Sequence, residues 1–157
     1  ALTGKKNREH HVITSLELEA LRQEVFNEKL QRKYREIEAN EVRYETLYCE
    51  DADYIFVAYG SCARIAHKAV QLAREKGIKV GLLRPITLFP FPTQPIKALA
   101  QRVKGILTVE MSAGQMVYDV KLASEFKCPV EYFGRYGGII PTPQEVVEAL
   151  ENKLIKG

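Results

Sequence analysis

Between residues 78 and 92 the chain reads Ile-Lys-Val-Gly-Leu-Leu-Arg-Pro-Ile-Thr-Leu-Phe-Pro-Phe-Pro, and this stretch combines the features that decide the fold. Its first half is a short aliphatic run, which is typical of a strand buried on both faces of a sheet. Arg84-Pro85 is expected to leave the sheet, because proline has no N–H for the ladder and restricts the backbone of the residue before it. The apolar loop that follows, held by Pro90 and Pro92, should cap the end of the sheet or pack against another domain.

Strands and helices alternate on both sides of this stretch. Residues 54–59 form another buried aliphatic run, Gly60-Ser61 turns the chain into a helix at 62–76, and Gly77 is expected to be its C-cap residue. The pattern further predicts strands at 106–110 and 129–133, a weaker edge strand at 42–48, and helices at 94–103, 115–126 and 142–154. Such alternation with short connections predicts an α/β fold with a doubly wound, mostly parallel sheet and helices on both faces.

The first forty residues have a different pattern. Residues 1–13 lack periodicity and are interpreted as a tail, and Thr14-Ser15-Leu16-Glu17 is a candidate capping box. From Leu18 to Ile37, apolar residues recur at spacings of three and four among many charges, which predicts one long amphipathic helix ending near Asn40. We therefore predict a tail and long linking helix at 1–40 and an α/β domain at 41–157.

Composition restricts the class of protein. The 157 residues are 46% hydrophobic and 27% charged, with a net charge of +3 at pH 7, which indicates a globular protein. No block of Lys and Arg is interleaved with aromatic residues, so nucleic acid is not expected as a partner. No apolar run approaches the roughly 20 residues that span a bilayer, so no membrane is expected either. Cys49, Cys62 and Cys128 stand alone, which offers no ligand set for zinc or an iron–sulfur cluster and fits a reducing cytoplasm.

Ligands of open α/β sheets bind at the carboxyl ends of the strands, near the point where the strand order reverses. The turn at Gly60 has one glycine where a dinucleotide fingerprint needs three, and the phosphate-binding pattern G-x-x-x-x-G-K-[ST] is absent from the sequence. The loops that follow the strands still hold six candidates for a small-anion site, namely Gly60, Ser61, Arg84, Glu110, Gly114 and Arg135. No catalytic motif is formed by these residues.

The candidates also have structural interpretations. Gly60-Ser61 is interpreted preferentially as a tight turn with an N-cap serine. Glu110 is equally suited to be a general base with a shifted pKa or to accept N–H groups at the start of the next helix. Glycines beside Arg135 are more typical of a mobile or interface loop, and Cys62 is interpreted as a small buried thiol.

Several segments carry a family resemblance, and they are Tyr59-Gly60-Ser61 with Arg64, residues 77–92, Val109–Met116 with Asp119-Val120, and Gly137-Gly138 before Pro141-Thr142. Their order is similar to that of the C-terminal domain of the transketolase-like, thiamine-diphosphate-dependent enzymes. Within that superfamily the sequence most closely resembles the α-chain of the 2-oxoacid:ferredoxin oxidoreductases. The pieces Glu110-Met111-Ser112 and Gly114-Gln115-Met116 are most similar to the 2-ketoisovalerate-type members.

The resemblance implies a five-stranded mixed sheet whose first strand, at 42–48, is antiparallel. It also implies a fragment of a larger enzyme, which agrees with a chain that starts at Ala1 and not at Met. Enzymes of this family decarboxylate a 2-oxoacid on thiamine diphosphate, pass two electrons through iron–sulfur clusters to ferredoxin and transfer the acyl group to coenzyme A. Thiamine diphosphate, Mg²⁺ and the clusters would lie in other domains. This piece is therefore expected to bind no cofactor, to be inactive alone, and to supply an interface within an oligomeric enzyme of several subunits.

Two other functions stay open at this point. The chain could be an autonomous module that binds a small anion or nucleotide at Gly60-Ser61, Arg84 and Arg135. It could also be the same domain of a transketolase or of a 2-oxoacid dehydrogenase β-chain.

Overall fold

The structure is a computed structural model, and it describes residues 7–9 and 15–156. The chain divides into two compact units, with the boundary between Glu36 and Ile37. The predicted tail and the cap residue Thr14 fall largely outside the described residues. None of the described helices is long and apolar enough to cross a bilayer.

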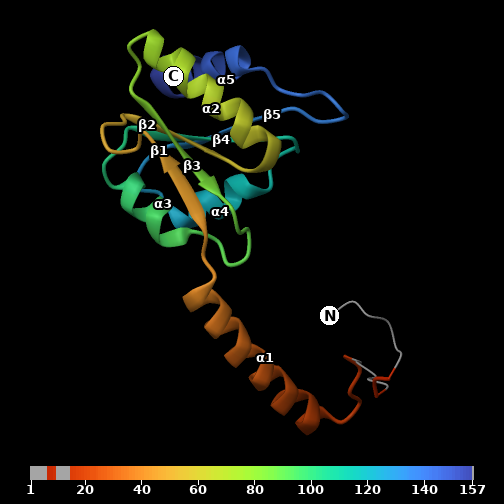
Figure 1. Ribbon diagram of the computed structural model, residues 1–157. Coiled ribbons are helices and arrows are strands. Elements are labelled where there is room, and N and C mark those ends of the chain that lie inside the picture. Colours follow the sequence, from red (N-terminus) through yellow and green to blue (C-terminus); the bar gives the residue numbers. More distant parts are fainter. Residues whose placement is uncertain (1–6, 10–14, 157) are drawn as a thin grey trace. The chain divides into compact units, whose positions relative to one another are not determined.

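The first unit contains most of helix α1, Ala20–Asn40 (Figure 1). The predicted helix start at residues 14–17 is wrong, because the described residues 15–19 are not helical. The Glu17 carboxylate accepts the backbone N–H of Glu19 at 3.2 Å, so it satisfies a donor just before the helix. No residue of α1 is buried, and most of its apolar stripe is exposed, with Leu21 71% accessible.

The second unit is built on a five-stranded sheet in the order β1-β3-β2-β4-β5. The strands are β1 (Tyr44–Leu47), β2 (Tyr54–Ala58), β3 (Val80–Pro85), β4 (Gly105–Glu110) and β5 (Val130–Gly134). Strands β2 to β5 are parallel, and β1 pairs with β3 in the antiparallel direction. The prediction of a mostly parallel sheet with an antiparallel edge strand is confirmed.

Helices cover both faces of the sheet, as expected for a doubly wound fold. Helices α2 (Gly60–Glu75) and α5 (Pro143–Leu150) pack on the face that presents Phe56 and Leu107. Helices α3 (Thr93–Ala100) and α4 (Met116–Ala123) pack on the opposite face, against Ile55 and Ile106. A π-helical segment, Glu151–Ile155, continues α5 (Figure 1). Alternate residues of the central strands thus supply two cores, one on each side of the sheet.

Proline at position 85 does not leave the sheet, and that prediction is wrong. Pro85 pairs with Tyr44 as the last residue of β3. The pairing of β3 with β2 ends two residues earlier, at Leu83. At Pro85 the pairing partner of β3 is β1, and the N–H of Ile86 donates to the Arg43 carbonyl. A proline is tolerated at this position because the ladder needs no donor from it.

Local signals at two helix ends are confirmed. The C-cap residue of α2 is Lys76, and Gly77 directly follows it with φ +81°, the left-handed conformation that favours glycine at the end of a helix. Thr142 caps α5 in a complete capping box, in which its hydroxyl accepts the N–H of Glu145 and the Glu145 carboxylate accepts the N–H of Thr142.

Candidate functional site

The loops that follow β2, β3, β4 and β5 lie at one end of the parallel sheet, here called the carboxyl edge. The chain moves from β2 to β3 on one side and then crosses to β4 on the other side. The strand order therefore reverses between β2 and β4, which is where doubly wound folds place ligands. Gly60 follows β2 at this point and Glu110 ends β4, so the two lie at the switch point.

Glu110 is the most completely engaged side chain at this point. It is 2% exposed, and its Oε2 accepts the N–H groups of Gln115 and Met116 and the hydroxyl of Ser112, each at 3.0 Å. Its Oε1 accepts the N–H of Val117 at 3.0 Å. Between the two interpretations of Glu110, the structure shows the second, a carboxylate that accepts donors at the start of the next helix.

The loop after Glu110 is fixed by further contacts. Gly114 has φ +100° and donates its N–H to the Ser112 hydroxyl at 3.2 Å, while the Tyr132 hydroxyl donates to the Ser112 carbonyl. A Cβ at Gly134 would lie 2.7 Å from that carbonyl oxygen, so β5 approaches the loop too closely for any larger residue. Burial raises the pKa of Tyr132, and the nearby charge of Glu110 raises it further. The Tyr132 hydroxyl thus stays a protonated donor that ties β5 to this loop.

The start of α2 differs from the prediction at Ser61. Tyr59 is the N-cap residue and no side chain caps the helix, so the prediction of an N-cap serine is wrong. Gly60 has φ +56°, which makes the turn out of β2, and the exposed Ser61 already lies in the helix. Cys62 is buried, as interpreted, and burial first and the charge of Glu110 second raise its pKa. A protonated, enclosed thiol of this kind is not a nucleophile.

Both candidate arginines are paired with carboxylates. Arg84 Nη1 lies 2.9 Å from Glu45 Oε2, across the β1–β3 pair. Arg135 Nη1 lies 3.1 Å from Glu145 Oε1, and so joins the loop after β5 to the capping box of α5. The six candidates of the sequence are all on the carboxyl edge, but they are spread over four strands and their charged groups are satisfied within the domain.

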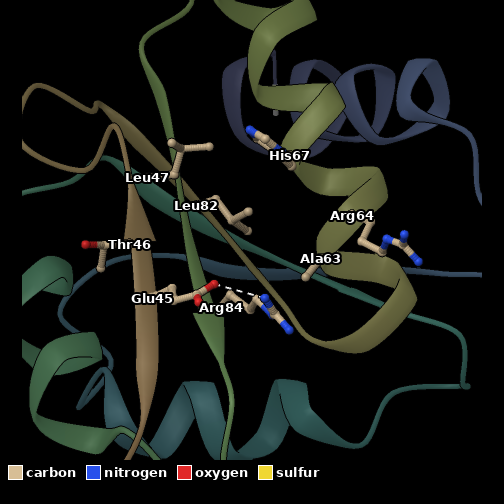
Figure 2. Close-up of a pocket in the computed structure, with 8 residues that line it drawn as sticks. All are labelled: Glu45, Thr46, Leu47, Ala63, Arg64, His67, Leu82 and Arg84. Carbon is tan, nitrogen blue, oxygen red and sulfur yellow. Dashed lines mark hydrogen bonds and ion pairs between the residues drawn. The ribbon is translucent and has the colours of Figure 1, made fainter.

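A groove of about 310 Å³ opens between α2 and the β1–β3 pair (Figure 2). It is lined by Glu45, Thr46, Leu47, Ala63, Arg64, His67, Leu82 and Arg84. Figure 2 shows the Arg84 guanidinium beside the Glu45 carboxylate, and the Arg64 side chain directed away from the strands. The groove therefore has an apolar floor without free cations converging on it.

Sequence reasoning did not find the contribution of His67 and Glu45 to this groove. His67 lies three residues after Arg64 on one helix, a spacing that places both on the same face. Glu45 could be found only from the register that sets it opposite Arg84. In the described part of the chain no group of three or more His, Cys, Asp or Glu side chains could hold a metal ion.

Comparisons with known proteins identify the domain. The pyruvate:ferredoxin oxidoreductase core domain II family matches residues 52–146. The ketoisovalerate oxidoreductase subunit VorB of Methanothermobacter marburgensis is 49% identical over 138 residues, which cover 88% of this chain and 39% of that protein. The 2-oxoglutarate synthase subunit KorA of Methanothermobacter thermautotrophicus is 37% identical over 101 residues, covering 64% of this chain and 27% of that protein.

Solved structures agree on the fold. A 2-oxoglutarate:ferredoxin oxidoreductase from Magnetococcus marinus, with 2-oxoglutarate, coenzyme A and succinyl-CoA bound, superposes with a TM-score of 0.76 at 21% identity, over 98% of this chain and 28% of that one. A split-gene transketolase, an inactive beta4 tetramer, gives a TM-score of 0.61 at 21% identity, over 72% of this chain and 41% of that one. The transketolase-like fold expected from the sequence is confirmed.

The chain covers only part of the length of these relatives. It spans about two fifths of the length of the VorB subunits it matches. The family profile covers more than half of this chain and includes β2 to β5 entirely. The chain belongs to the pyruvate:ferredoxin oxidoreductase core domain II family.

Proposed function

We propose that this chain is the C-terminal, transketolase-like domain of the α-chain of a 2-oxoacid:ferredoxin oxidoreductase of the ketoisovalerate type. The whole enzyme would convert a branched-chain 2-oxoacid to the acyl-CoA with reduction of ferredoxin. The single observation that carries the proposal is the 49% identity to VorB over 88% of the chain, against 37% identity to KorA over 64%. The division between residues 1–40 and 41–157 is proposed as the boundary between linking helix and domain.

The domain itself would have a structural and interface role and would supply no catalytic side chain. The carboxylate of Glu110 is committed to four donors at the start of α4. Arg84 and Arg135 are paired with Glu45 and Glu145. The groups with the chemistry for catalysis at the switch point are therefore already used to hold the fold.

Thiamine diphosphate, Mg²⁺ and the iron–sulfur clusters would be bound by the remainder of the enzyme. The donor set of this domain does not fit a cluster, since Cys49, Cys62 and Cys128 are free and buried among apolar side chains, and the described residues contain no group of three potential metal ligands. We assign the domain no step that passes through these cofactors. Other subunits, ferredoxin and coenzyme A are proposed as partners of the whole oligomeric enzyme. The three free thiols support a cytoplasmic location.

A chimeric enzyme tests the proposal. In it, this chain replaces the matched segment of the Methanothermobacter marburgensis VorB subunit, which is then produced with its partner subunits. The expected result is ferredoxin reduction that requires both ketoisovalerate and coenzyme A. An assembled chimera that fails to reduce ferredoxin with any of the 2-oxoacids tested would contradict the proposed function.

The isolated chain provides the complementary measurement. We expect no change in its melting temperature with thiamine diphosphate, coenzyme A or nucleotides. A saturable increase with a nucleotide would instead favour the autonomous anion-binding module, and substitution of Arg84 or Arg135 by Gln would then locate the site.

A further inference from the structure

Large apolar side chains are exposed on the carboxyl edge of the domain. The loop after β3 exposes Phe89 by 60%, and the loop after β5 exposes Ile140 by 66%. The latter loop projects from the domain in Figure 1. We define the edge patch as six exposed residues in the loops that follow β3, β4 and β5, namely Ile86, Leu88, Phe89, Met111, Ile139 and Ile140. Large apolar side chains exposed on several loops at the same end of a sheet are suited to contact with another surface.

The opposite end of the sheet has a different character. Its loops, at 48–53, 76–79, 101–104 and 125–129, are rich in Asp, Glu, Lys and Arg. Among the described residues of these loops, the exposed large apolar side chains are Tyr48 and Phe126. Tyr48 is covered on one side by the Arg74 guanidinium, 4.8 Å from its ring centre. The loops at the two ends of the same sheet thus differ in polarity.

Charges beside the edge patch are neutralised within the domain. Arg84 and Arg135 pair with carboxylates as described above, and Arg43 Nη2 lies 3.0 Å from Glu41 Oε2. A surface that is apolar and has its charges paired internally is suited to contact with protein, and offers little to an anionic ligand or nucleic acid.

The loop after β3 presents its apolar side chains from a fixed backbone. The N–H groups of Ile86 and Thr87 both donate to the Arg43 carbonyl, and the Thr87 hydroxyl donates to the Pro90 carbonyl at 2.9 Å. Phe91 packs against the core on the inner side of the loop. Because the loop is held in place before any contact is made, docking loses little conformational entropy.

The position of residues 41–43 suggests what covers the patch. Because β1 runs antiparallel to the other strands, it begins at the carboxyl edge, and Arg43 is bonded directly to the loop after β3. The covalent link from the preceding chain therefore reaches the domain at the end of the sheet that carries the edge patch, which favours contact with parts of the same polypeptide over contact with a separate molecule. The VorB relatives have about three fifths of their length outside the match with this chain.

We infer that the edge patch is the surface through which this domain docks on the remainder of its own subunit, and that the facing surface is apolar and uncharged. The inference rests on the proposed function, and it assigns the interface to one edge of the sheet. Helix faces and the groove of Figure 2 are not part of it.

Hydrogen exchange of backbone amides tests the inference by comparison of the isolated chain with the VorB chimera. In the chimera, we expect amides in segments 86–91 and 136–140 to exchange at least about tenfold more slowly than in the isolated chain. Amides of segment 125–128, at the opposite edge, are the internal control and should not change. Phe89→Asp in the chimera should remove the protection of both edge segments, whereas the matched variant Phe126→Asp, at a position 71% exposed, should leave it intact.

The possible outcomes separate this inference from the proposed function. Protection of 125–128 without protection of the edge segments would overturn the assigned surface, whether or not the chimera is active. Protection that already occurs in the isolated chain and increases with its concentration would show a second copy as the occupant, and would also overturn the inference. An inactive chimera with protected edge segments would contradict the proposed function and leave the docking surface standing.

Discussion

The Glu110 carboxylate accepts the backbone N–H of Met116 at 3.0 Å, so the last residue of β4 holds the first residue of α4. This buried contact joins a strand to the helix that follows it through a charged group. The same carboxylate also binds the N–H groups on either side of Met116. The switch point is therefore held by a negative charge placed at the positive end of a helix dipole.

Replacing this carboxylate should reduce stability without a change of fold. Glu110→Gln substitutes an NH₂ group for one acceptor oxygen, and this group faces a backbone donor. We expect a loss of about 1.5–3 kcal/mol in the free energy of unfolding, the range for hydrogen bonds to a charged group. Urea denaturation of the two proteins measures the loss. Glu131→Gln, at a half-buried position on the neighbouring strand β5, is the control and should change stability little.

The acid sensitivity of α5 should depend on Glu145. The N–H and then the hydroxyl of Thr142 lower the pKa of this carboxyl below its usual 4.5, and Arg135 lowers it further. A depressed folded-state pKa contributes stability that is present above the unfolded value and is lost as pH falls through the folded value. Glu145→Gln should thus be less stable than the wild type at neutral pH and equal to it in strong acid.

A series of urea unfolding curves across this acidic range checks the dependence. Glu148→Gln, an exposed position on the same helix, should run parallel to the wild type throughout. A constant difference between Glu145→Gln and wild type at every pH would show that the carboxyl charge is not the source of the effect.

Most of the fold could be predicted from local patterns, because buried parallel strands and amphipathic helices leave periodic signals. Residues 54–58 are a continuous apolar run, residues 105–110 are mostly apolar apart from Thr108 and Glu110, and both segments form central strands. The capping box at Thr142 could also be predicted, because its two residues lie within a four-residue segment.

Features that depend on register could not be predicted. Pro85 stays in the sheet because β2 pairs no further than Leu83, which only the strand alignment reveals. The pairing of Arg84 with Glu45 joins residues 39 apart in sequence. Arg102 likewise donates to the carbonyls of Cys49 and Glu50, more than fifty residues away. Such contacts leave no periodic pattern in the sequence. The candidate residues could therefore be assigned to the carboxyl edge, but the contacts among them could not be predicted.

Two glycines in the sheet should respond differently to alanine. A Cβ at Gly81 would lie 2.8 Å from the Tyr48 carbonyl oxygen and 3.0 Å from Cys49 Cα, so the backbone must move. A Cβ at Gly105 would meet only the end of the Leu154 side chain, 2.9 Å from Cδ2, which can rotate away. We expect Gly81→Ala to cost about 1–3 kcal/mol and Gly105→Ala clearly less. Thermal unfolding of both variants tests the order, and equal losses would contradict it.

Thr108 should be a site of stabilisation. Its side chain is fully buried in β4, and within the described residues its hydroxyl has no hydrogen-bond partner. Thr108→Val keeps the shape and removes the unpaired oxygen, so we expect the free energy of unfolding to rise by about 1 kcal/mol. Ser124 is the matched control, because its equally buried hydroxyl donates to the Lys121 carbonyl at 2.8 Å, and Ser124→Ala should therefore destabilise. Chemical denaturation measures the free energy of unfolding of both variants. A loss of stability in Thr108→Val comparable to that in Ser124→Ala would mean that the Thr108 hydroxyl has a hydrogen-bond partner in solution.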